Sequence, residues 1–149
     1  MRACLVALAC VALVRSPARA AGHPAIATLH FERVDDDAGT ARVAAQFADT
    51  FASVSGSLDI GALSDAFETP EPCPDRAPRC LAVTAVVMRV DYVVFGSVQR
   101  VGHRFHVRTQ VFERATGKIR NWFAIATIDP GSLASVSRGV CTALVERLR

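Results

Sequence analysis

Residues 91–127 narrow the choice of folds more than any other part of this chain, because strand-like runs there alternate with short turns. Residues 91–100 read Asp-Tyr-Val-Val-Phe-Gly-Ser-Val-Gln-Arg, a turn at Gly102-His103 follows, and the chain returns over residues 105–114 to a second turn, Ala-Thr-Gly-Lys. Runs of β-branched and aromatic residues between glycine-containing turns are typical of antiparallel strands. The segment predicts a three-stranded antiparallel meander.

The returning strand of this meander has two chemically different faces. Side chains alternate along a pleated strand, so apolar and polar residues are separated onto opposite sides. One side would carry Phe105, Val107, Thr109 and Val111, and the other Arg104, His106, Arg108 and Gln110. We expect the first side to contact helices and the second to face water.

The rest of the chain supplies helices and two further strands. Residues 25–31 and 58–60 are short apolar runs that predict strands, and a helical turn is expected around residues 64–67. Apolar residues at helical spacing predict helices over residues 39–54, 80–90 and 133–148, the last with Ser132 as its cap. The fold class predicted is α/β: a two-layer sandwich in the order β-α-β-α-β-β-β-α, with a mixed sheet, a terminal meander and helices on one face.

The first 20 residues predict a secretory signal peptide. Arg2 precedes an apolar run from Ala3 to Val14, and small residues end the segment at Ala18-Arg-Ala20. The apolar run is shorter than the roughly 20 residues that span a bilayer. We expect cleavage before Ala21, leaving residues 21–149 as one domain in the periplasm or outside the cell; lipidation of Cys10 is the alternative.

Removal of the signal changes the charge of the protein. Three of its 17 basic residues and none of its 14 acidic residues lie in the signal, so the mature chain has 14 of each. Nucleic-acid binding depends on a basic excess. The balanced charge therefore argues against a nucleic-acid partner.

Cys73 and Cys80 flank a proline-rich loop, and we expect them to form a disulfide in an oxidising compartment. Two free thiols are the alternative. Cys141 lies on the apolar stripe of the last helix, and we expect it to be a small buried hydrophobic residue.

Residues that could carry out catalysis are scattered. The sequence has no Gly-x-Ser-x-Gly, glycine-rich phosphate loop, His-Glu-x-x-His or Cys-x-x-Cys motif. His103 and His106 are expected on opposite sides of the strand and so could not share a metal ion. The acidic run of residues 35–37 is expected to be a solvated loop. We therefore predict no catalytic, metal or cofactor-binding residues and no cofactor.

One concentration of charge suggests a binding surface. Arg104, His106 and Arg108 form a basic row, and Trp122 is expected near the same face. Aromatic and arginine side chains dominate binding hot spots. We predict contact with an anionic partner, such as an acidic envelope protein, lipid headgroups or a wall polymer. A solvated face that prevents sheets from stacking is the alternative.

The sequence resembles the TolB amino-terminal-type domain, which is related to CsgG-type proteins. The resemblance rests on the meander of residues 91–127 and on the opening strand, residues 25–32, which reads Ala-Ile-Ala-Thr-Leu-His-Phe-Glu. Family members usually have Asp-Phe where this chain has His30-Phe31, and Leu-Gly-Ala where it has Met88-Arg89-Val90. The resemblance covers about residues 25–127 and implies a non-enzymatic envelope module. In TolB a β-propeller follows this domain, and the partner contacts of that propeller do not carry over.

The function predicted is an exported, non-enzymatic envelope domain that binds a protein or another envelope component. Its oligomeric state is left open. One alternative is a small thiol-redox or hydrolytic enzyme that uses Cys73 and Cys80. Another is a carrier that holds a small ligand between the sheet and the helices.

Overall fold

The computed structural model describes residues 24–148, apart from the side chains of residues 123–128 and 130. The predicted signal, its cleavage point and Cys10 lie outside these residues. In chain order the elements are β1 (Ile26–Arg33), α1 (Ala38–Ser55), β2 (Leu58–Asp59), α2 (Ile60–Ala66), α3 (Pro78–Val87), β3 (Tyr92–Val101), β4 (Arg104–Glu113), β5 (Lys118–Ile128), the 3₁₀ turn η1 (Pro130–Ser132) and α4 (Leu133–Leu148).

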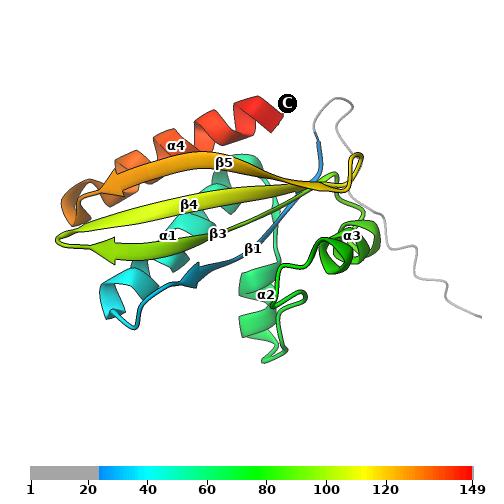
Figure 1. Ribbon diagram of the computed structural model, residues 1–149, viewed down its shortest axis with the longest axis horizontal. Helices are drawn as coiled ribbons and strands as arrows, with labels where there is room; N and C mark the ends of the chain where they lie inside the picture. The colour runs from blue at the N-terminus through cyan, green and yellow to red at the C-terminus, as the bar shows by residue number, and fades with distance from the viewer. Residues whose placement is uncertain (1–23, 149) are drawn as a thin grey trace, which may run out of the picture.

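The strands form a single mixed sheet in the order β2-β1-β3-β4-β5 (Figure 1). β1 pairs in parallel with β2 and β3, whereas β3, β4 and β5 are antiparallel. The two meander turns contain Gly102 and Gly117, with φ of +64° and +65°, a backbone region that glycine enters at little steric cost. The predicted meander is confirmed.

The residues that flank α1 explain where the helix begins and ends. The Oδ1 atom of Asp37 accepts hydrogen bonds from the N–H groups of Gly39, at 2.8 Å, and Thr40, at 3.3 Å. These donors have no partner inside the helix. Gly56 follows the last turn with φ of +64°, the left-handed conformation that commonly ends a helix.

α1 and α4 pack side by side on one face of the sheet and enclose the larger core. Phe47 of α1 meets Phe31 of β1 edge to face, with 5.0 Å between ring centroids. Cys141 of α4 is fully buried and unpaired, as predicted. Burial raises the pKa of its thiol to about 12, because a thiolate is poorly stabilised in an apolar core.

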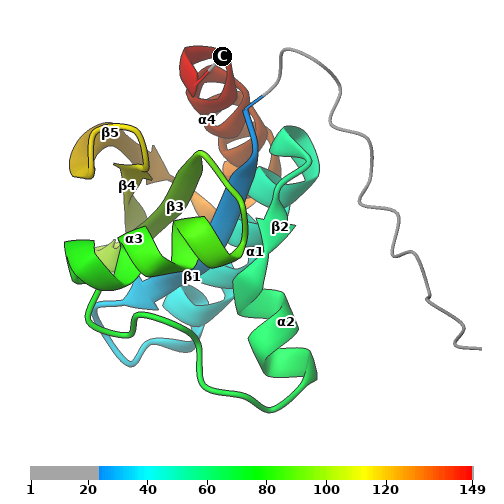
Figure 2. The same cartoon turned by 90° about the vertical axis from the view of Figure 1, so that its right-hand side faces the viewer.

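The predicted α/β class and two-layer sandwich are confirmed, with one difference in where the helices lie. α3 packs on the second face of the sheet, where Leu81 and Ala85 bury a smaller core with Val93 and Phe95. Figure 2 shows α3 and α4 on opposite sides of the sheet. The expectation of helices on one face was wrong for α3, because the first half of β3 is apolar on both sides and needs cover on both.

Two further differences concern local structure. The helical turn expected around residues 64–67 belongs to a longer helix, α2, whose amino terminus is capped by the Asp59 side chain. Ser132 does not directly cap the amino terminus of α4, contrary to the expectation. It ends the 3₁₀ turn η1, and its hydroxyl donates to the carbonyl oxygen of Asp129 at 3.1 Å. None of the helices within residues 24–148 has the length and hydrophobicity needed to cross a membrane.

Candidate partner-binding surface

The second face of the sheet is covered over only part of its area. α3 lies over the start of β3, whereas the hairpin end of β3 and β4 carries no helix on this side (Figure 1). Gln110 pairs with Phe95 across the strands, which places the polar row of β4 on the same face as α3. We call this uncovered area the open patch; its residues are Ser97, Gln99, Val101, Arg104, His106, Arg108, Gln110 and Asn121.

The predicted alternation along β4 is confirmed by burial. Phe105, Val107, Thr109 and Val111 are buried, whereas Arg104, His106, Arg108 and Gln110 are exposed or half-buried. Arg104, His106 and Arg108 therefore share the open patch, as predicted. Whether they bind a partner stays a prediction.

The cations of the open patch differ in their existing partners. The Nε atom of Arg104 lies 3.3 Å from Asp129 Oδ1, and both side chains are more than half exposed, at 52% and 58%. Such surface pairs contribute little stability and can exchange partners. Arg108 is exposed and makes no ion pair within residues 24–148. A carboxylate of a partner could therefore bind Arg108 without displacing a carboxylate that is already bound there.

Trp122 does not lie on the open patch, contrary to the expectation. It pairs across the strands with Thr109, whose side chain is buried on the α1 and α4 side. Trp122 packs against the larger core, and the guanidinium of Arg147 lies 5.8 Å from its ring centroid. A register shift between β4 and β5 lies next to this pair, and such irregularities are difficult to predict from residue alternation alone.

Three other arginines of the meander, Arg100, Arg114 and Arg120, each pair with a carboxylate. Arg100 pairs with Asp37 at 2.6 Å, Arg114 with Asp91 at 3.0 Å, and Arg120 with Glu113 at 2.8 Å. Among the described residues, the positive charge of the open patch therefore comes from Arg104 and Arg108, and the His106 side chain lies on the same face between them.

The acidic run of residues 35–37 has a structural role. Asp37 caps α1, and its hydrogen bond with Arg100 holds the pKa of the Asp37 carboxyl below its usual range. Asp35 accepts a hydrogen bond from the backbone N–H of Arg100 at 2.7 Å. Within the described part of the chain, no three His, Cys, Asp or Glu side chains are placed to hold a metal ion.

Cys73 and Cys80 are joined in a disulfide, as predicted. Cys73 is buried at 2% exposure, and its loop positions Arg76. The Arg76 guanidinium donates to the carbonyl oxygens of Cys73 and His30, both at 3.1 Å, and pairs with Glu71 at 2.8 Å. Sequence reasoning missed this network, because nothing in the local pattern links residues 30 and 76.

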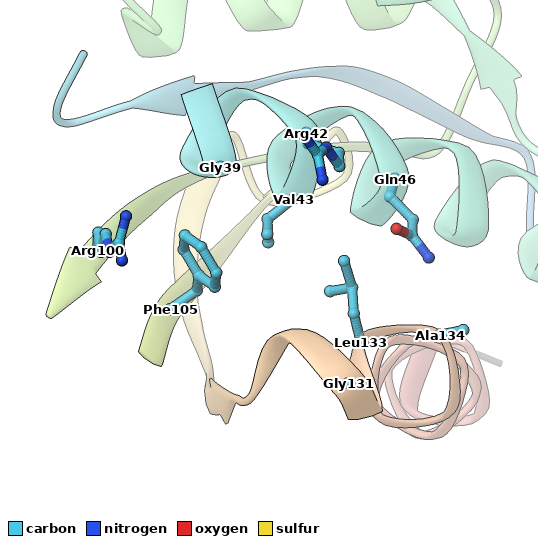
Figure 3. Close-up of a pocket in the computed structure, with 9 residues that line it drawn as sticks. All are labelled: Gly39, Arg42, Val43, Gln46, Arg100, Phe105, Gly131, Leu133 and Ala134. Atoms are coloured by element: carbon cyan, nitrogen blue, oxygen red, sulfur yellow. The ribbon is translucent and has the colours of Figure 1, made fainter. Parts of the chain in front are cut away.

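A cleft of about 430 Å³ opens on the opposite side of the sheet, between the start of α1 and the start of α4. Figure 3 shows Val43, Phe105 and Leu133 pointing toward one another at its floor. All three are buried. Arg42, Gln46 and Arg100 also line this cleft. The sequence pattern suggested space between sheet and helices but did not identify these residues.

Comparisons with known proteins show the fold. No family model matches the chain, and no curated protein matches it. Among solved structures, TolB from Acinetobacter baumannii matches 85% of this chain at 14% identity with a TM-score of 0.51, and the chain spans 28% of the length of TolB. A PelC dodecamer from Paraburkholderia phytofirmans matches 85% of this chain and 87% of its own at 12% identity, with a TM-score of 0.46. The chain therefore has a TolB-like fold, and its relationship to CsgG-type proteins stays a prediction.

Proposed function

We propose that the mature chain is an exported, non-enzymatic binding domain of the bacterial cell envelope, and that its open patch docks onto an acidic surface of another envelope protein. The observation that carries this proposal is the uncovered part of the second sheet face, which we have called the open patch. It presents Arg108 without an acidic partner among the described residues, beside Arg104 and His106. Arginine and amide groups on a flat surface suit carboxylates, which accept charge-assisted hydrogen bonds.

Two further observations support an exported binding role. A disulfide between Cys73 and Cys80 fits an oxidising compartment. The burial of Cys73 favours a structural bridge over a catalytic thiol pair, which needs accessible sulfur. Because the mature chain has equal numbers of acidic and basic residues, attraction to an acidic partner would be local to the open patch.

Site-specific photo-crosslinking tests the proposed surface. A photoreactive residue at Gln99, exposed within the open patch, should capture a specific envelope protein in the cells that export this chain. The same residue at Glu146, exposed on α4, is the control. Capture of the same species at both positions, or of none at Gln99, would contradict the proposal. Capture of lipid or wall polymer alone would contradict the protein partner.

Charge reversal then tests the chemistry. We expect Arg108→Glu to weaken binding to the captured protein at least about tenfold at low salt. Arg138→Glu, which makes the same change at an exposed position on α4, should have little effect. Equal binding by the two variants would mean that the open patch is only a solvated face.

A further inference from the structure

The cleft between α1 and α4 has the chemistry of a ligand site. Its floor is apolar and buried, formed by Val43 at 3% exposure, Phe105 at 5% and Leu133 at 8%. Its volume of about 430 Å³ falls in the range of small-molecule pockets, roughly 300 to 1,000 Å³. The part of an apolar ligand that reaches this floor could therefore be removed from water by side chains that are already in place.

The charged side chains that line the cleft are cationic. Arg42 is exposed on α1 and makes no ion pair within residues 24–148, and Gln46 lies one turn further along the helix. Among the described side chains, none that lines the cleft is acidic. Arg42 and Gln46 are therefore available as hydrogen-bond donors to an anion.

Arg100 closes one end of the cleft in a fixed position. Its Nε atom donates to the carbonyl oxygen of Gly102 at 3.0 Å, and its Nη1 atom pairs with Asp37 at 2.6 Å. The guanidinium carbon lies 6.0 Å from the centre of the Phe105 ring. Because Asp37 already balances the charge of Arg100, Arg42 supplies the uncompensated positive charge.

We infer that this cleft binds a small amphipathic anion, with a carboxylate at Arg42 and Gln46 and an apolar chain against Val43, Phe105 and Leu133. A medium-chain fatty acid fits this description. The head group meets an unpaired guanidinium, and the chain meets a buried apolar floor. The inference concerns the face opposite the open patch and does not depend on the proposed docking partner.

Titration with decanoate, below its critical micelle concentration, tests this site in the mature protein. Backbone amide shifts in NMR spectra should cluster around Val43, Phe105 and Leu133. Decanol has the same chain without the charge, and acetate has the charge without the chain. Both should bind at least about tenfold more weakly, because each lacks one of the two contacts.

Matched variants separate this site from nonspecific binding. Arg42→Gln should weaken decanoate binding about tenfold, whereas Arg138→Gln, the same change at another exposed surface position, should not. Gln46→Trp should block the cleft without changing the melting temperature by more than a few degrees. Equal binding by the two arginine variants, undiminished binding by Gln46→Trp, or shifts centred on α3 would each overturn the inference.

Discussion

Gly96 illustrates how much one position can matter in a small sheet. A Cβ atom added there would overlap the carbonyl oxygen of Arg108 on the neighbouring strand and would lie 2.5 Å from Cε1 of Phe31. The first neighbour is backbone within the β3 and β4 pairing, and the second is a buried ring. Neither can move without disturbing the core, so the close approach requires glycine.

We expect Gly96→Ala to lower the free energy of unfolding by about 2 to 3 kcal/mol, because overpacking a rigid core forces strain on its neighbours. Urea denaturation measures this change. The control is Gly139→Ala in α4, where an added Cβ meets nothing within 4 Å. Since alanine favours helix over glycine, the control should be neutral or stabilising. Equal midpoints for the two variants would contradict this account.

At the scale of elements, α3 depends on the disulfide loop that precedes it. The sequence separation of Cys73 and Cys80 is 7, and the bridge joins the buried end of the loop to the first turn of α3. The same loop carries Arg76, which contacts β1 and lies 5.9 Å from the Phe95 ring centroid. The disulfide therefore helps to hold α3 in place against the second face of the sheet.

Replacing both Cys73 and Cys80 with alanine should lower the free energy of unfolding by about 2.5 kcal/mol, the loop-entropy value for so short a ring. Unfolding with and without dithiothreitol measures the effect. The wild type should lose stability in the reductant, and the double variant should be insensitive to it. Cys141→Ala, which leaves the bridge intact, should respond to reductant as the wild type does. A reductant-insensitive wild type would argue against a stabilising bridge.

At the scale of the whole molecule, every described element lies after the predicted signal. β1 starts at Ile26, and the backbone N–H of Ala25 donates to Asp91 at 2.9 Å. Cleavage before Ala21 would therefore remove no residue of the sheet or of the described helices. The described residues of both cores follow the predicted signal.

We expect the exported form to begin at Ala21 and to unfold in one cooperative transition. Intact mass spectrometry of the envelope fraction should give the mass of residues 21–149, less two hydrogens for the disulfide. Circular dichroism should follow a single unfolding curve. A mass that corresponds to a chain lipidated at Cys10 or to the uncleaved precursor would contradict this prediction, as would two separate unfolding steps.

Local sequence patterns were sufficient for much of this fold. The meander followed from glycine turns and alternation, because a two-residue turn fixes the register of the strands beside it. The stripe of Val43, Phe47 and Phe51 likewise predicted α1, and the cysteine spacing predicted the bridge. These features depend on neighbours that are close in the chain, so the sequence contains their physical cause.

The amino-acid sequence by itself determined the long strands and helices and which side of β4 is polar, because these depend on residue spacing, whereas it indicated only part of α2. The tertiary structure decided that α3 covers the second face, that Trp122 faces the core, and that Arg42 and Leu133 border one cleft. Those outcomes depend on packing between segments far apart in the chain and on a register shift, and no local pattern specifies either.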